Sequence, residues 1–286
     1  MKRLLKDPIV SGVAAGGTAT VEFPLGPRYF TAWLYYQDGG GAIDILTAIE
    51  EIRVLINGKI QRRFTAAEVN AVNLLRGAEY GVQPIAGDDA ILPLYFAQPW
   101  MRTLQGENDL AFGTGNVASF QLQIDFAAGL TTPSLQVYAS IDDAVEPGAQ
   151  PGTFRKVSLG RIIKTRKINQ NVTATGLNVL NSLEKLGDAY EFIHAESANI
   201  SEVKIYVDNL QVYSATKAMA DAYLAQYGMT PVAGSFDIFW DADRQIGSLL
   251  QTANNNGQLI QEFRVEFTMS SAASFDILYG VRGFAD

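Results

Sequence analysis

Short segments in which apolar and polar residues alternate dominate this chain. Residues Gln121–Phe126 alternate without a break, and so do residues Glu262–Phe267. The segments around Val54 and Ile205 follow the same pattern. A period of two places apolar side chains on one face of a β-strand and polar side chains on the other. Many short strands with few helices between them predict an all-β protein built from sandwiches or barrels.

Two segments predict helices instead. The first is Thr65–Arg76, in which Thr65 and Glu68 form a capping-box pattern and after which Gly77 marks the end. The second is Thr216–Gln226, which also ends shortly before a glycine. Each follows a pair of alternating segments, so a β-hairpin is expected before each helix.

The chain repeats itself internally. Residues Glu51–Asn57 align with Glu202–Asp208, and each copy leads into one of the predicted helices. Further matches follow in the same order in both halves: Leu94–Phe96 with Ile238–Trp240, Leu122–Phe126 with Phe263–Phe267, and Ser134–Val137 with Ser274–Ile277. One match between alternating strands can arise by chance, but an ordered series predicts two domains of like fold.

The length and a linker-like segment place the boundary between these domains. A chain of 286 residues suits two domains of about 140 residues each. Residues Asp142–Gly152 are rich in proline and glycine, the chemistry of a surface linker. The predicted domains are therefore residues 1–145 and residues 146–286.

Composition narrows the function classes. The chain is 48% hydrophobic, enough for a sizeable core, and its formal net charge of −8 makes it a poor general binder of nucleic acid. It has no cysteine, which excludes disulfides, thiolate metal sites and a cysteine nucleophile. The basic start, Met1–Pro8, has no apolar core and predicts no secretory signal, and no apolar run is long enough to span a bilayer.

Candidate catalytic residues are few. His194 is the single histidine, so a catalytic triad would have to use it, yet no Gly-x-Ser-x-Gly elbow accompanies it. Alternation places Tyr190, Phe192 and His194 on one strand face, which favours a packed strand histidine. We therefore predict no catalytic residue, no cofactor-binding residue and no metal ligand.

Acidic residues on predicted loops are either calcium ligands or solvated side chains, and a glycine run is either a phosphate loop or a hairpin tip. Asp88-Asp89, and Asp142-Asp143 near Glu146, could hold calcium, but no EF-hand spacing is present and adjacent loop acids are usually solvated. Gly39–Gly41 lacks the Gly-Lys-Ser/Thr that completes a phosphate loop and predicts a hairpin tip.

Basic residues gather in two places. One is a stretch without acidic residues that contains Arg155, Lys156, Arg161, Lys164, Arg166 and Lys167. It is either a solvated strand edge or a surface for anionic lipid or an acidic neighbour. The other is the N-terminus, where Lys2, Arg3 and Lys6 stand beside two leucines. That segment is either a weak lipid anchor or a disordered tail.

With the repeat in hand, the sequence resembles the double jelly-roll major capsid proteins of membrane-containing icosahedral bacteriophages, closest to the corticovirus type. The segments that carry the resemblance are Val13–Gly16, Phe23–Gly26, Ile52–Gly58, Phe112–Thr114 and Leu224–Gly228. The sequence departs from that type in its loops, notably around Gly39–Asp44 and Pro84–Ala90.

The resemblance implies an all-β fold of two tandem jelly-roll β-barrels, with a short helix inserted in each. It implies a structural protein rather than an enzyme, made in the host cytoplasm and located in the virion. Homotrimers would form pseudo-hexagonal capsomers that tile a shell over an internal membrane. The partners would be neighbouring capsomers, vertex (penton) proteins and, peripherally, the inner viral membrane, with no direct contact to nucleic acid. Calcium is associated with the family, although no ligand can be assigned.

A carbohydrate-binding or carbohydrate-active protein with two β-sandwiches is the alternative. Jelly rolls host sugar binding, and Trp33, Trp100 and Trp240 could stack on sugar rings. The size of the assembly separates the two, because the capsid interpretation requires a trimer that can build shells.

Overall fold

The computed structural model divides the chain into two compact units. It describes residues 1–39, 44–85, 89–101, 103–148, 150, 152–185, 188–253 and 257–286. The first unit comprises Met1–Asn73, Ala78–Lys164 and Phe284–Asp286, and the second comprises Leu74–Gly77 and Thr165–Gly283. Among the described residues, no helix is long and apolar enough to cross a membrane.

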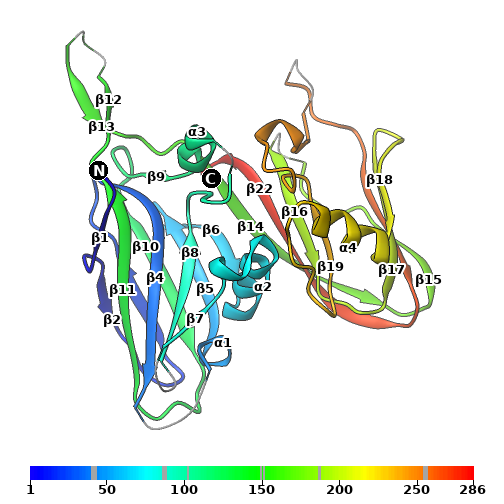
Figure 1. Ribbon diagram of the computed structural model, residues 1–286, viewed down its shortest axis with the longest axis horizontal. Coiled ribbons are helices and arrows are strands. Elements are labelled where there is room, and N and C mark those ends of the chain that lie inside the picture. Colours follow the sequence, from blue (N-terminus) through cyan, green and yellow to red (C-terminus); the bar gives the residue numbers. More distant parts are fainter. Residues whose placement is uncertain are drawn as a thin grey trace. The chain divides into compact units, whose positions relative to one another are not determined.

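The first unit is built from two antiparallel sheets around one core (Figure 1). One sheet has the order β1(Arg3–Leu5), β11(Pro133–Asp142), β4(Arg28–Asp38), β8(Ala90–Tyr95), β7(Gln83–Pro84), with β9(Phe112–Gly113) on β4. The other has the order β6(Lys59–Phe64), β5(Ile49–Ile56), β10(Phe120–Phe126), β3(Thr18–Glu22), β2(Ile9–Ser11). Side chains from both sheets meet in the core, where Tyr36 of β4 stacks on Phe126 of β10 with ring centroids 6.2 Å apart.

The second unit repeats this plan. One sheet has the order β19(Phe236–Phe239), β16(Ala189–Ala195), β22(Ala273–Phe284), β14(Arg161–Val172), with β20(Leu250–Gln251) on β16. The other has the order β15(Gly176–Leu180), β21(Phe263–Met269), β17(Ile200–Val207), β18(Leu210–Thr216). Tyr190 of β16 and Phe263 of β21 join the two sheets across the core, with ring centroids 4.8 Å apart.

The predicted repeat is confirmed strand by strand. The order β3-β10-β5-β6 of the first unit returns as β15-β21-β17-β18, and the order β11-β4-β8 returns as β22-β16-β19. Val54 and Ile205 lie in the equivalent strands β5 and β17, as the alignment requires. Val54 pairs with Leu122, whereas Ile205 pairs with Val265. By strand pairing, Leu122 therefore corresponds to Val265, whereas the sequence alignment matched Leu122 with Phe263. The alignment was thus off by two residues, and a shift of two leaves each side chain on the same face of the strand.

Both predicted helices follow a hairpin. Asn57-Gly58 and Asp208-Asn209 take positive φ angles at the turns, as two-residue hairpin loops require. Helix α2(Ala66–Arg76) follows the first hairpin, and α4(Lys217–Gln226) follows the second. The capping box is present: the N–H of Glu68 donates to Thr65 Oγ1 at 3.1 Å, and the N–H of Thr65 donates to Glu68 Oε2 at 2.6 Å.

The remaining helices are short. α1(Ile45–Ala48) precedes β5, α3(Leu104–Asp109) precedes β9, and the single 3₁₀ turns η1(Ala78–Tyr80) and η2(Ile246–Ser248) lie in loops.

The segment expected to link the domains forms a hairpin of the first unit. β12(Val145–Pro147) and β13(Phe154–Lys156) pair with one another in a sheet of their own. The chain passes from the first unit to the second between Lys164 and Thr165, within β14. The boundary predicted at 145/146 falls at the start of this hairpin.

Candidate functional site

The second unit buries a three-residue ionic cluster. Arg76, the last residue of α2, donates to Glu191 on β16 at 2.9 Å and also to Asp241, which follows β19. All three side chains are buried, and the guanidinium lies 4.7 Å from the centroid of the Phe239 ring. Buried charges are tolerated only when paired, so this cluster fixes residues Leu74–Gly77 within the second unit.

Sequence reasoning missed this cluster, although a signal was present. Glu191 is a charged residue inside a strand, Ala189–Ala195, in which every residue is buried. A charge at such a position requires a partner of opposite sign. The partner, Arg76, is 115 residues away in the sequence, so the pattern could not identify it.

His194 lies in a second buried network. Its Nδ1 contacts Asp237 Oδ1, and its Nε2 lies 3.7 Å from Glu196 Oε1. Ser235 donates its hydroxyl to Asp237 Oδ2 at 2.7 Å. Both ring nitrogens face carboxylates, and the serine contacts the aspartate rather than the imidazole. This is not the arrangement of a catalytic triad, in which the serine hydroxyl bonds to histidine.

The prediction that Tyr190, Phe192 and His194 share one strand face is wrong for Tyr190. A β-bulge lies between Tyr190 and Phe192, because Tyr190 pairs with Val281 and Phe192 pairs with Gly280. A bulge inserts an extra residue and reverses the alternation beyond it. Tyr190 therefore joins the core, while Phe192 and His194 point to the opposite face of the sheet.

The surroundings of His194 favour its charged form. Burial by itself lowers the pKa of His194, but the hydrogen bonds to Asp237 and Glu196 and the charges of these two residues outweigh burial and raise the pKa to about 9. The imidazole is therefore protonated at neutral pH and acts as the cation of a buried ion pair.

Among the acidic residues considered for calcium, Asp142 and Asp143 are engaged by basic side chains. Arg28 donates to both carboxylate oxygens of Asp142, at 3.1 and 2.7 Å. Asp143 pairs with Arg3 and lies 3.7 Å from Lys156. Asp88 lies outside the described residues, as do Gly40 and Gly41, while Asp89 accepts from Tyr35 at 2.8 Å. Calcium stays a prediction.

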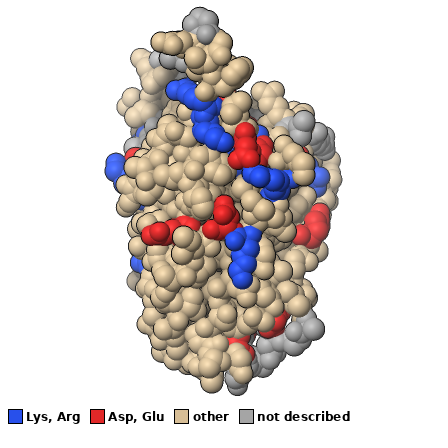
Figure 2. Space-filling model, turned by 90° about the vertical axis from the view of Figure 1, so that its left-hand side faces the viewer, with Lys and Arg blue, Asp and Glu red and all other residues tan. Residues whose placement is uncertain are grey.

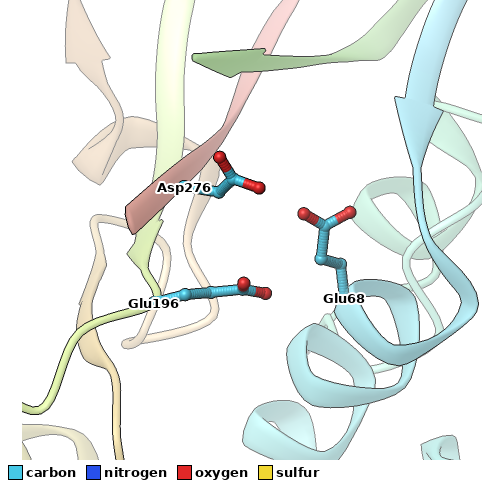
Figure 3. A group of neighbouring side chains, drawn as sticks. All are labelled: Glu68, Glu196 and Asp276. Carbon is cyan, nitrogen blue, oxygen red and sulfur yellow. The ribbon is translucent and has the colours of Figure 1, made fainter. Parts of the chain in front are cut away.

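Three further carboxylates are drawn in Figure 3. Glu196 and Asp276 belong to the second unit, where the N–H of Glu196 donates to the carbonyl of Asp276 at 2.9 Å. Glu196 approaches His194, and Asp276 pairs with Lys167 at 2.8 Å. Burial raises the pKa of Asp276, but the hydrogen bonds from Lys167 and Asn169 outweigh it and lower the pKa. Glu68 belongs to the first unit, where it completes the capping box of α2.

The basic stretch is largely neutralised by the chain's own acids. The pairs within the first unit are Arg155–Glu146 at 2.8 Å, Lys156–Asp143 at 3.7 Å and Lys164–Asp286 at 3.2 Å. Those within the second unit are Arg166–Glu184 at 3.8 Å and Lys167–Asp276 at 2.8 Å. On the face drawn in Figure 2, basic and acidic side chains lie next to one another, and no large area carries a single sign of charge.

The N-terminus is ordered, so the alternative of a disordered tail is wrong for this segment. Arg3–Leu5 forms β1, which pairs with β11. Lys2 pairs with Glu107 at 2.6 Å, and Lys6 donates to Gln136 at 2.7 Å. The basic side chains therefore lie along the sheet surface.

Trp100 and Trp240 pack edge-on against tyrosines instead of forming a platform for sugar rings. Trp100 is buried, and its ring meets those of Tyr80 and Tyr95 edge-on, with centroids 5.6 Å apart in each pair. Trp240 is half-buried and meets Tyr190 edge-on at 6.2 Å. A hollow of the first unit is lined by Trp33, Glu79 and Glu107, but Glu107 already pairs with Lys2. The carbohydrate alternative finds no support here.

Comparison with known proteins assigns a family to both halves of the chain. Residues 5–142 match the family described as viral coat protein P2 N-terminal domain, and residues 162–281 match the viral coat protein P2 C-terminal domain. Compared by sequence with curated proteins, the chain matches none of them.

Solved structures share the fold across the whole chain. The major capsid protein P2 of bacteriophage PM2 superposes with a TM-score of 0.85 at 18% identity, covering 100% of this chain and 98% of that one. The STIV MCP superposes with a TM-score of 0.69 at 11% identity, covering 99% and 96%. VP54 of PBCV-1 gives a TM-score of 0.64 at 9% identity, covering 100% and 96%. The predicted double jelly-roll fold is thereby confirmed.

Replacing Arg76 with methionine should destabilise the protein by about 3–5 kcal/mol, because it leaves two carboxylates buried without their cation. Arg63→Met is the matched control, since Arg63 is 59% exposed beside Glu51 and its loss should cost less than about 1 kcal/mol. Urea denaturation followed by tryptophan fluorescence measures both. Equal midpoints for the two variants would show that the cluster does not stabilise the fold.

Stability should fall as the pH rises past neutrality. The pKa of His194 is about 9 in the folded protein against an ordinary value of 6.5. Its stabilising effect is therefore complete below about pH 6.5 and disappears as the pH passes 9, a loss of up to about 3 kcal/mol. In His194→Gln this decline should be absent. Urea midpoints at pH 6.5, 8 and 9.5 measure the difference, and parallel pH profiles for parent and variant would refute it.

Proposed function

The chain belongs to the viral coat protein P2 family, and we propose that three copies of it form one capsomer of an icosahedral shell that encloses a membrane. As a major capsid protein it is a structural component of the virion, in agreement with the expectation that it is not an enzyme.

The observation that best supports a trimer is the tandem repeat, whose two halves share a fold but differ in detail. Both units have the same strand order, so one chain presents two barrel-like bodies. Three chains then supply six such bodies, which suits a pseudo-hexagonal tile. A head-to-tail contact repeated around a three-fold axis closes on itself and leaves the outer surfaces for contacts with neighbouring capsomers and vertex proteins.

One end of the first unit is suited to lie against the internal membrane. Figure 1 shows the N-terminus, the C-terminus and the β12–β13 hairpin toward the same end of that unit. The exposed apolar side chains of these segments include Leu4 at 62%, Phe154 at 71% and Phe284 at 65% exposure. Because the nearby basic residues are paired within the chain, apolar insertion supports this contact better than net charge does. Contacts repeated over a shell would add up even if each is weak.

The purified protein should be a trimer of about 93 kDa, three times the 31.1 kDa of one chain. Light scattering coupled to size-exclusion chromatography at micromolar concentration measures this mass. A stable monomer under these conditions would contradict the proposal.

Phe154→Ser should reduce flotation of the protein with liposomes several-fold, because Phe154, the more exposed of the large apolar side chains described in the hairpin, is removed from the lipid surface. Changing Lys2, Arg3 and Lys6 to serine should reduce it less, and mainly at low salt. Leu177→Ser is the control, since Leu177 is 61% exposed in the second unit. Flotation on vesicles of neutral and anionic lipid checks this, and equal binding by Phe154→Ser and the parent would argue against this orientation.

A further inference from the structure

The two units differ in how their sheets end. In the first unit, the four strands β3-β10-β5-β6 are flanked by β2 beyond β3 and by β14, whose residues up to Lys164 belong to this unit, beyond β6. Nε of Arg62 on β6 also donates to the carbonyl of Ile163 on β14 at 2.7 Å. Among the described residues of the second unit, the equivalent sheet stops at β15 and β18, and β18 pairs with β17 alone. Within that part of the chain, no strand covers the outer edge of β18 as β14 covers its counterpart, β6.

This difference appears in burial. At β6, Gln61 and Arg62 are buried. At β18, Leu210 is 69% exposed and Val212 is 38% exposed.

The edge of β18 lacks two of the usual protections against pairing, charged residues and proline. Natural proteins guard exposed edges with charged residues, proline or a bulge that twists the edge away. Residues Leu210–Thr216 contain neither a charge nor a proline, whereas β6 carries Lys59, Arg62 and Arg63. The single bulge of this hairpin lies opposite Ile205/Tyr206, which leaves the stretch from Tyr213 to Thr216 in regular register.

A groove lies beside this edge within the second unit. It is bounded by β18, α4 and β19, has a volume of about 430 Å³, and is lined in part by Val212, Ala215, Met219, Tyr223, Phe239 and Trp240. Met219 is 63% exposed at its rim. Backbone groups along an open edge, next to a mainly apolar hollow, are the two elements that β-strand addition uses for affinity and specificity.

We propose that a neighbouring copy of this chain covers the β18 edge, adding backbone pairing along β18 and an apolar side chain in the groove. The occupant follows from the repeat: in the first unit the same edge is covered by a strand of this very chain, and an assembling coat protein presents many copies of that chain. The absence of charge along the edge fits a like neighbour better than a charged partner. This inference rests on the proposed capsid function and adds the surface through which copies meet.

The first experiment places lysines on the surface. In the double variant Val212→Lys, Met219→Lys, both positions are solvent-exposed in the single chain, so its urea midpoint should stay close to that of the parent. The charges should block pairing, and the fraction of assembled protein should fall at least tenfold in light scattering. Ile60→Lys is the matched control, because Ile60 is 42% exposed beside Lys59 and should assemble like the parent. A double variant that assembles like the parent overturns the inference.

The second experiment does not depend on how the lysine variant folds. A photoreactive benzoylphenylalanine replaces Val212, and chains of normal and heavy isotope content are mixed, assembled and illuminated. Cross-linked peptides that combine light and heavy chains are expected in assembled material and should disappear in urea-dissociated material. Cross-links confined to one chain, in particles that do assemble, overturn the inference alone. A parent chain that remains monomeric and gives no mixed cross-link overturns both the inference and the proposed function.

Discussion

A β-strand has hydrogen-bonding groups along both of its edges, and the need to pair them governs this protein. Within each unit two sheets pack face to face, and this packing buries their apolar side chains in one shared core. Face-to-face packing leaves the hydrogen-bonding groups at the sheet edges unpaired, and the two units differ in how these edges are covered. In the first unit β2 and β14 flank the four-strand sheet, whereas among the described residues of the second unit β15 and β18 end the corresponding sheet. A coat protein can use an open edge, because what is exposed in one chain becomes an interface in the shell.

Charge in this chain serves the fold more than it serves ligand binding. The net charge is −8, yet basic residues of the linker-like hairpin, of β14 and of the N-terminus find acidic partners within their own unit. The buried cations Arg76 and His194 are each held by two carboxylates.

Burial on both faces explains why the histidine and the glutamate inside strand β16 need charged partners. Both faces of β16 are covered, so the strand reads as a continuous buried run rather than an alternating one. The bulge after Tyr190 lets that aromatic ring reach the core while Phe192 packs against Gly280, where a Cβ would lie 2.2 Å from the ring. Packing on both faces thus leaves Glu191 and His194 dependent on partners inside the protein, Arg76 for Glu191 and Asp237 for His194.

The sequence by itself determined the features that depend on near neighbours. Alternation identified β5, β10, β17 and β21, a capping box identified the start of α2, and the ordered matches identified two copies of one topology. These succeed because strand faces and helix caps follow from residues only a few positions apart. Only the tertiary structure decided the two-residue shift in register, the bulge in β16, the hairpin within Asp142–Lys156 and the pairing of β1 with β11. The partners of Arg76 and Lys167 lie more than 100 residues away, and which distant groups meet is set by how the sheets close, a constraint that no local pattern carries.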